Sequence, residues 1–305
     1  MKNSRRTFIK QTSLATAALW IGNNSFIRPG DEYILGLQLY SVRDDMAANP
    51  ADTLTRVAQM GYKYVEHANY QQGKFYGYTP DEFKKILDDL GINMVSGHCV
   101  LDKKHWDSST KDFTDEWKKT IDHAVVAGQK YIISPWFDEE ERKTKESLLQ
   151  FLDMFNKCGE LCKKSGIKFG YHNHDFEFNT KVDEELLYDF ILKHTDPALV
   201  VQQMDTGNMY GVGGRAAEII AKYPGRFELM HVKDEIPSEN GEMGGKYESA
   251  VLGTGEIGIE KVLEAAKTTG ATKYFIVEQE SYQGMQPLDC AEKNFGVMRS
   301  MGIGS

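Results

Sequence analysis

The sequence has few cysteines, and its basic residues are outnumbered by acidic ones. Each of these features argues against a class of protein. Its 305 residues include only four cysteines, which do not form the pattern of a disulfide framework. Cys158 and Cys162 are four residues apart on an expected helix, so they would share one face. Because no second Cys/His pair has zinc-finger spacing, we interpret them as small buried residues rather than as metal ligands. The formal net charge of −9 disfavours a nucleic-acid-binding protein.

Long apolar runs are also missing. The apolar segment 13–22 is shorter than the ~20 residues that a membrane-spanning helix needs, and it follows a charged stretch, as in a signal peptide. The pair Arg5-Arg6, within Ser-Arg-Arg-x-Phe-Ile-Lys, is typical of the bacterial twin-arginine export signal. We therefore interpret residues 1–30 as a signal segment. We expect an exported, periplasmic protein that keeps no membrane span once the signal is removed.

The remaining chain has no domain linker and no internal repeat beyond an alternation of β-type runs with amphipathic helical segments. Eight such units favour a single (β/α)8 TIM barrel over residues 31–305. A doubly wound open sheet is the alternative, but no Gly-x-Gly-x-x-Gly turn follows the first strand. The expected strands are 34–40, 62–66, 92–98, 131–136, the start of 166–178, 200–205, 227–233 and 274–280, and the expected helices are 49–60, 79–90, 110–127, 145–165, 184–194, 215–223 and 258–269.

Each of the last four expected strands ends in side chains of the kind that bind metals or move protons. Residues two apart in a strand point to the same face, and the carboxyl ends of parallel barrel strands meet at one mouth. The sequence therefore predicts one site at that mouth. These side chains are His172 and His174, Asp205, His231 and Lys233, and Glu278 and Glu280.

Five segments resemble the xylose isomerase-like TIM barrels, and the resemblance covers about residues 34–301. That superfamily holds sugar phosphate isomerases and epimerases, ketose 3-epimerases, inosose dehydratase and apurinic endonucleases. The Tyr-His-Asn-His version is similar to the branch with inosose dehydratase-like and 3-keto-sugar-processing proteins. The five segments are 169–174 (Phe-Gly-Tyr-His-Asn-His), 204–208 (Met-Asp-Thr-Gly-Asn), 230–234 (Met-His-Val-Lys-Asp), 253–257 (Gly-Thr-Gly-Glu-Ile) and 276–280 (Ile-Val-Glu-Gln-Glu).

The resemblance implies a metal centre. In ketose-epimerase-like members, Glu, Asp, His and Glu from strands five to eight hold a divalent metal. Carried over by motif, this implies that Asp205, His231 and Glu278 bind one Mn²⁺, Mg²⁺, Co²⁺ or Zn²⁺ ion. His172 occupies the strand-five position of the glutamate, and we interpret it as a fourth ligand or as a hydrogen-bond partner of the substrate. This departure removes one of the two bases of a two-glutamate epimerisation.

The residues expected to carry the proton transfer are Glu278, Lys233 and His172. Lys233 shares a strand face with His231, which directs it into the barrel mouth; the alternative is an ordinary surface lysine. Burial and a neighbouring metal would both lower its pKa and favour a neutral amine that acts as a base or donates to a sugar hydroxyl.

The early strands carry candidate sugar contacts, because amides and imidazoles hydrogen-bond to hydroxyl groups and an indole stacks on a sugar ring. Packing in the core or in a loop is the alternative for each of them. The expected substrate contacts are Gln38, Glu66, His98, Trp136 and His174. The glycine-rich segment 234–254 is expected to be a long loop that covers the site.

The favoured interpretation is a divalent-metal-dependent sugar isomerase or epimerase that acts through an enediolate. One alternative is a lyase or dehydratase acting on a keto-sugar, a keto-glycoside or an inosose. An alternative of another class is an exported barrel that binds a sugar without converting it. In each case the partner is a small sugar or sugar derivative, no nucleic acid is expected, and a homo-oligomer stays possible.

Overall fold

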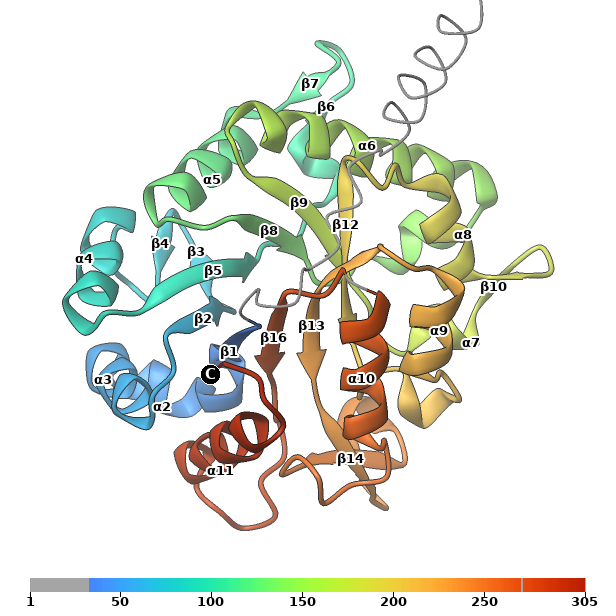
Figure 1. The fold of residues 1–305 in the computed structure, drawn as a ribbon. Coiled ribbons are helices and arrows are strands. Elements are labelled where there is room, and N and C mark those ends of the chain that lie inside the picture. The colour runs from blue at the N-terminus through green and yellow to red at the C-terminus, as the bar shows by residue number, and fades with distance from the viewer. Residues whose placement is uncertain (1–32, 270, 305) are drawn as a thin grey trace, which may run out of the picture.

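The structure is a computed structural model that describes residues 33–269 and 271–304, so the predicted signal segment lies outside the described residues. Within these ranges, eight parallel strands close into a barrel that helices surround (Figure 1). This confirms the predicted single (β/α)8 barrel. Its strands are β1 (Ile34–Gln38), β2 (Tyr64–His67), β5 (Asn93–His98), β8 (Tyr131–Ser134), β9 (Lys168–His172), β12 (Val200–Asp205), β13 (Phe227–Val232) and β16 (Tyr274–Val277).

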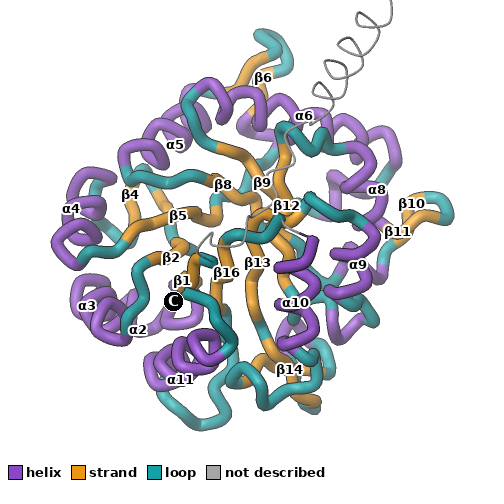
Figure 2. The backbone as a smooth tube through the Cα atoms, viewed as in Figure 1, coloured by secondary structure: helices purple, strands orange, loops and turns teal. Residues whose placement is uncertain are grey.

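The outer helices begin and end at residues that cap them. In α4 (Pro80–Leu90), Thr79 and Glu82 bond reciprocally in a capping box, and Gly91 ends the helix with a φ of 66°. Figure 2 shows the resulting ring of helices outside the strands. The other α-helices of the described residues are α2 (Arg43–Ala48), α3 (Pro50–Met60), α5 (Asp115–Val126), α6 (Lys145–Lys164), α7 (Phe176–Asn179), α8 (Leu187–His194), α9 (Ala216–Lys222), α10 (Ile259–Thr269) and α11 (Pro287–Ser300).

The segment expected to be a long loop after the seventh strand is instead largely a β-hairpin. Strand β14 (Asp234–Pro237) pairs antiparallel with β15 (Tyr247–Ala250). The Asp234 carboxylate accepts hydrogen bonds from the backbone N–H groups of Gly253 and Gly255, each at 2.9 Å, which fixes the glycine-rich segment behind the hairpin. Because the hairpin follows β13 directly, it stands at the mouth of the barrel, where the sequence predicted a cover.

The interior of the barrel is filled by apolar and aromatic side chains, including Ile133, Leu229 and Ile276, all buried. A second buried cluster, between the barrel strands and the outer helices, contains Cys158 and Cys162. The Trp117 indole N–H donates to Cys158 Sγ at 3.2 Å. The interpretation of these cysteines as buried packing residues is therefore confirmed.

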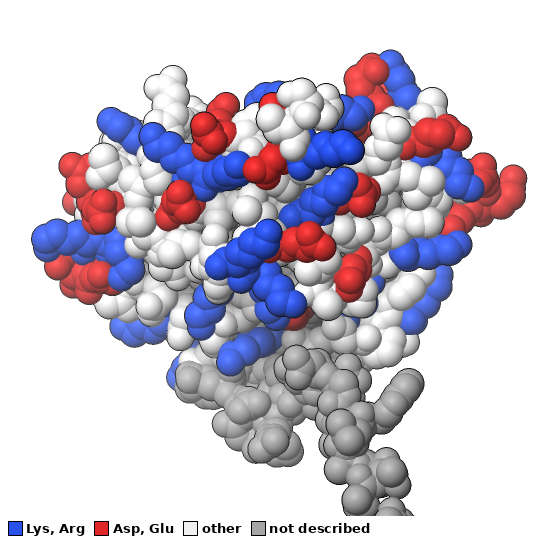
Figure 3. Space-filling view, turned by 90° about the horizontal axis from the view of Figure 1, so that it is seen from above, with Lys and Arg blue, Asp and Glu red and all other residues white. Residues whose placement is uncertain are grey.

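The surface carries charges of both signs. Lys, Arg, Asp and Glu side chains are interspersed over the face shown in Figure 3. None of the helices in the described part of the chain combines the length and the apolar character needed to cross a bilayer.

Candidate active site

Three of the predicted metal ligands meet at the mouth of the barrel. Asp205 ends β12, His231 lies beside it in the register of β13, and Glu278 follows β16. Each offers a ligand atom within 4.8 Å of the others, and all three side chains are buried. The His231 Nδ1 atom lies 2.9 Å from Glu278 Oε2 and 3.7 Å from Asp205 Oδ2. The pairing of β12 with β13, and of β13 with β16, therefore brings together residues far apart in the sequence.

The Asp205 carboxylate supplies an observation on this structure that tests the fit of a metal. Its Oδ1 atom accepts hydrogen bonds from the backbone N–H groups of Gly207 and Asn208, both at 2.8 Å. Its Oδ2 atom is buried, has no hydrogen-bond partner and lies 3.5 Å from Lys233 Nζ, so it keeps lone pairs that a metal ion could use. A set of one imidazole and two carboxylates suits a divalent cation such as Mn²⁺, Mg²⁺, Co²⁺ or Zn²⁺. The residues present therefore fit the implied metal.

The orientation of His231 is fixed from behind by Glu66. The His231 Nε2 atom lies 2.5 Å from Glu66 Oε1, which leaves Nδ1 for the side of Asp205 and Glu278. A carboxylate that holds the second nitrogen of a histidine is a common support of metal-binding imidazoles. Burial alone would raise the pKa of the Glu66 carboxyl, but His98 and His231 lower it well below its usual range, so Glu66 stays ionised.

His98 and His172 are held by a residue that the sequence analysis did not single out. The Gln203 Oε1 atom lies 2.9 Å from His98 Nε2 and 3.0 Å from His172 Nδ1. His98, His172 and His231 also form a set that could hold an ion. We interpret this set as a hydrogen-bonded support, because Gln203 and Glu66 already engage a nitrogen of each ring.

His172 has one ring nitrogen directed toward the predicted metal ligands. Its Nε2 atom lies 3.8 Å from Asp205 Oδ2 and 3.4 Å from Asn208 Nδ2. Burial, with His231 and His98 nearby, lowers the pKa of His172 well below its usual value, so the ring is neutral, as a metal ligand must be. Both predicted roles, fourth ligand and substrate partner, are compatible with this position.

Lys233 lies among carboxylates, on the same side as His231. Its Nζ atom is 3.2 Å from Glu278 Oε2 and 3.5 Å from Asp205 Oδ2, and it also bonds to Glu280. Burial lowers the pKa of Lys233, but these three carboxylates raise it well above its usual value. The direction is opposite to that predicted from burial beside a metal, because the sequence analysis did not count the carboxylates. In this arrangement Lys233 is a cation.

The predicted substrate contacts of the first two strands have a different place in the structure. Gln38 and Glu66 are fully buried, and Gln38 Nε2 donates to Glu66 Oε1 at 2.6 Å. Gln203 Nε2 donates to Glu66 Oε2 at 2.7 Å. Both predicted residues therefore support His231 from inside the barrel, and their contact with a substrate stays a prediction. Their position at a strand end correctly predicted that both side chains point into the barrel, but it did not predict how far below the mouth they lie.

The remaining predicted contacts are more open to the mouth. The side chain of His98 is 13% exposed, and Trp136 is 40% exposed beyond the end of β8. His174 lies just beyond β9, with its ring centroid 5.2 Å from that of His172 and its Nδ1 atom buried without a partner. These three side chains are nearer to the mouth than Gln38 and Glu66, and their contact with a substrate likewise stays a prediction.

Two further residues belong to the site: Asn208, which was not predicted, and Glu280, which was predicted at the barrel mouth without a role. Asn208 Oδ1 lies 3.1 Å from Lys233 Nζ, and Glu280 bonds to the same nitrogen. The sequence indicated that Glu280 points the same way as Glu278, because it lies two residues further along the same strand. Asn208 follows a turn after β12, where strand alternation no longer predicts direction.

Glu177 holds the segment that carries His174, and its burial predicts a pH-dependent stability. Its carboxylate accepts hydrogen bonds from the Tyr171 hydroxyl and from His174 N–H, the latter at 3.0 Å. Burial raises the pKa of Glu177 from 4.5 to about 7. The folded state therefore favours the protonated acid. That contribution is fully present below pH 4.5, is lost as the pH rises through about 7, and amounts to about 3 kcal/mol.

Glu177→Gln should remove this dependence. We expect the unfolding free energy of the wild type, measured relative to the variant by urea denaturation, to fall by about 3 kcal/mol between pH 4.5 and 8. Glu146→Gln, on the exposed first turn of α6, is the control and should keep the wild-type profile. Parallel pH profiles for the wild type and Glu177→Gln would show that the buried acid does not titrate in this range.

Known proteins with similar sequences belong to a family of TIM barrels. The model of the xylose isomerase-like TIM barrel family matches residues 54–301. The inosose dehydratase of Clostridium perfringens strain 13 is 27% identical over 268 residues, which are 79% of this chain and 86% of that protein. The inosose dehydratase of Bacillus licheniformis is 30% identical over 173 residues, which are 52% of this chain and only 57% of that protein.

Solved structures resemble the whole barrel. A sugar phosphate isomerase/epimerase from Parabacteroides distasonis is 27% identical, with a TM-score of 0.72, and the match covers 88% of this chain and 98% of that one. Two structures at lower identity share the fold and contain metals. The IOLI protein, with a bound zinc atom, is 14% identical with a TM-score of 0.68, and a Mycobacterium smegmatis barrel in complex with magnesium is 15% identical with a TM-score of 0.63.

Proposed function

Because this chain belongs to the xylose isomerase-like TIM barrel family, we propose that it is a metal-dependent lyase acting on a keto-sugar, a keto-glycoside or an inosose. The enzyme would remove the proton next to the carbonyl group and then eliminate the substituent on the following carbon. The observation that carries the proposal is His172 at the strand-five position. Its neutral imidazole replaces the second carboxylate base that a two-glutamate epimerisation requires, and the relatives named inosose dehydratase support elimination.

The metal would be held by Asp205, His231 and Glu278, with His172 as the candidate fourth ligand. When bound there, it would supply Lewis acidity, which polarises a carbonyl group and acidifies the neighbouring C–H bond. Glu278 is the favoured base. Only its Oε2 atom contacts His231 and Lys233, whereas Oε1 has no hydrogen bond to a described residue. Removal of the proton leaves negative charge on the carbonyl oxygen, and the Lys233 ammonium would stabilise this charge.

Elimination also needs an acid for the departing group. The bond between the β-carbon and its oxygen breaks as the carbon–carbon double bond forms, and the oxygen takes up a proton. His98, His172 and His174 come from strands β5 and β9 and the segment after β9, away from the carboxylates of β12 to β16. We propose that the proton taken up by Glu278 passes to the leaving oxygen while these imidazoles hold that oxygen by hydrogen bonds, which gives an unsaturated ketone and water or an alcohol.

A single NMR experiment in D₂O tests the proposal. The metal-loaded protein is given scyllo-inosose and methyl 3-keto-glucoside, and the products are followed over time. Elimination gives the NMR signals of an unsaturated ketone, and its ultraviolet absorption can be measured on the same sample. Deuterium incorporated into an intact sugar without elimination would favour the second candidate, an isomerase or epimerase, which the Parabacteroides distasonis structure supports. A protein that binds these sugars but contains no metal and catalyses neither reaction would be the non-catalytic binding barrel.

We also propose that the protein is exported by the twin-arginine route, on the motif around Arg5 and Arg6. Replacing both residues by lysine keeps the charge but removes the pair, so we expect the protein to stay in the cytoplasm. Cell fractionation followed by immunoblotting measures this, with Lys2→Arg as the control. An unchanged periplasmic amount of the double variant would refute this route.

A further inference from the structure

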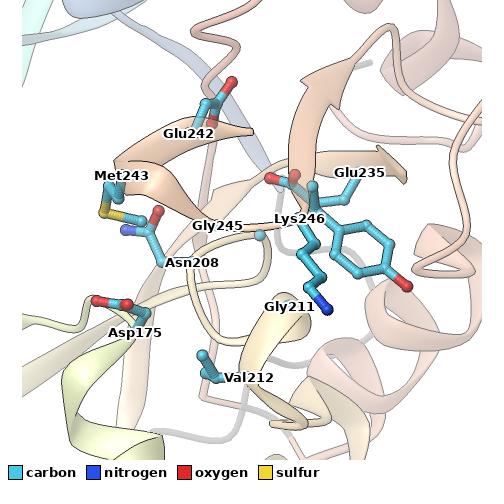
Figure 4. A pocket seen from close by; sticks show the side chains of 11 residues that line it. Asp175, Asn208, Gly211, Val212, Glu235, Glu242, Met243, Gly245 and Lys246 are labelled. Carbon is cyan, nitrogen blue, oxygen red and sulfur yellow. The ribbon is translucent and has the colours of Figure 1, made fainter. Parts of the chain in front are cut away.

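A cavity lies beside the candidate metal centre, between the β14–β15 hairpin and the segments that follow β9 and β12 (Figure 4). Its enclosed volume is about 60 Å³, and about 410 Å³ when the adjoining space open to solvent is counted, so a ligand there would lie partly in solvent. Asn208 lines this cavity, and it also contacts His172 at 3.4 Å and Lys233 at 3.1 Å. The cavity therefore borders the candidate active site through Asn208.

Glu235 gives the cavity a buried acid without a partner. Its side chain is only 4% exposed, and the carboxylate makes no hydrogen bond or ion pair with any described residue. A Cβ atom on Gly207 would lie 2.4 Å from Glu235 Oε1, so the glycine leaves room for this carboxylate. Burial, with Glu242 nearby, raises the pKa of Glu235 to about 8. Because no described residue bonds to this carboxylate, its hydrogen-bonding capacity is left for a ligand in the cavity.

Glu242, which lines the same cavity, is different because the protein already bonds to one of its two oxygens. Its Oε1 atom accepts hydrogen bonds from Ser249 N–H at 2.9 Å and from the Ser281 hydroxyl at 2.7 Å. Of these two acids that line the cavity, Glu235 is therefore the one whose two oxygens both lack a bond to a described residue.

The other groups around the cavity indicate a neutral, hydroxylated ligand. Asp175 lies across the cavity from Glu235 and Lys246 (Figure 4) and offers a second acceptor. Lys246 offers a donor and makes no ion pair with a described residue. Hydroxyl groups both donate and accept, so they match this mixture. A cationic ligand would be repelled by Lys246, and an anionic one by Asp175 and Glu242.

We propose that this cavity is a subsite for a hydroxylated ring, such as a second sugar, attached to the ring that undergoes elimination, and that Glu235 hydrogen-bonds two adjacent hydroxyl groups of it. The proposal rests on the proposed function and narrows its substrate class to a glycoside with a sugar-like substituent. In that reaction the bond to the substituent is the one that breaks, so the substituent must lie beside the site, as the cavity does.

The test compares three 3-keto-glucosides that differ only in the substituent: methyl, cyclohexyl and glucosyl. Cyclohexyl fills the space of a ring but has no hydroxyl groups. We expect the wild type to show a kcat/KM for the glucosyl compound about 10–100-fold above that for the other two, mainly through KM, since only the glucosyl compound offers hydroxyl groups to Glu235. Glu235→Gln and Glu235→Leu should lower the glucosyl-to-methyl ratio of kcat/KM at least about tenfold.

Glu248→Gln is the matched control. Glu248 lies on the same hairpin but bonds to Ser238 and Gln283 and does not line the cavity, so the ratio should stay at the wild-type value. Equal kcat/KM values for the cyclohexyl and glucosyl compounds, or an equal loss for all three substrates in Glu235→Gln, would overturn the subsite.

A second measurement separates this proposal from the reaction itself. If none of the three compounds is converted, their binding to wild type and Glu235→Gln is measured by isothermal titration calorimetry. Selective binding of the glucosyl compound that Glu235→Gln abolishes would support the subsite although the proposed reaction is wrong. Equal affinity for all three compounds, or no binding of any, would overturn the subsite.

Discussion

Lys233→Met is expected to lower turnover by ~10²–10⁴-fold, the usual effect of removing a positioned proton-transfer or charge-stabilising group. Methionine keeps most of the length and volume of the lysine side chain but lacks the nitrogen that contacts Glu278, Asp205 and Glu280. The negative charge that forms on the carbonyl oxygen of the substrate would then lack its cation. The rate is measured in the metal-loaded protein, together with its metal content and melting temperature, both of which should persist because the metal compensates part of the carboxylate charge.

Lys168→Met is the control for this experiment. Lys168 begins β9 at the opposite end of the barrel, where its Nζ atom bonds to Glu228 at 2.7 Å. We expect its replacement to leave turnover unchanged. A loss of less than tenfold in Lys233→Met, with an unchanged pH profile, would make Lys233 a structural cation. The charge stabilisation would then have to come from the metal and from His172.

The second large effect is expected for Asp205→Asn, which should lose the metal and the activity together. In the wild type, Oδ1 accepts from the N–H groups of Gly207 and Asn208, and Oδ2 is free for a cation. Asparagine can keep the first role with its oxygen, which turns its NH₂ group toward the cation. Since loss of a supporting residue already costs 10–100-fold in metal affinity, we expect the loss of a ligand to exceed ~100-fold.

Metal content after dialysis, measured by mass spectrometry, is compared with kcat/KM for the same samples. Asp183→Asn is the control: Asp183 is exposed, pairs with Lys145 and belongs to neither set of candidate ligands, so metal and activity should both stay at wild-type levels. Full metal occupancy and unchanged metal affinity in an inactive Asp205→Asn protein would show that Asp205 is not a ligand.

The fold and the composition of the site were predictable from the sequence because they depend on local patterns. Alternating β-type and helical periodicity, with capping residues such as Thr79 and Gly91, determined the (β/α)8 barrel. Strand parity and the resemblance of motifs determined that Asp205, His231 and Glu278 would meet at the carboxyl ends of the strands. These inferences need only the face to which a side chain points, and the period of a strand determines that face.

Only the tertiary structure decided how deep each side chain lies and which groups surround it. Gln38 and Glu66 are at the predicted strand ends, yet they lie beneath His231 and bond to each other. Lys233 points as predicted, but Asp205, Glu278 and Glu280 raise its pKa where a neutral amine was expected. The cavity around Glu235 likewise arises where the hairpin meets the turn after β12. Depth, charge balance and cavities depend on contacts between segments far apart in the chain, and no local period of the sequence encodes those contacts.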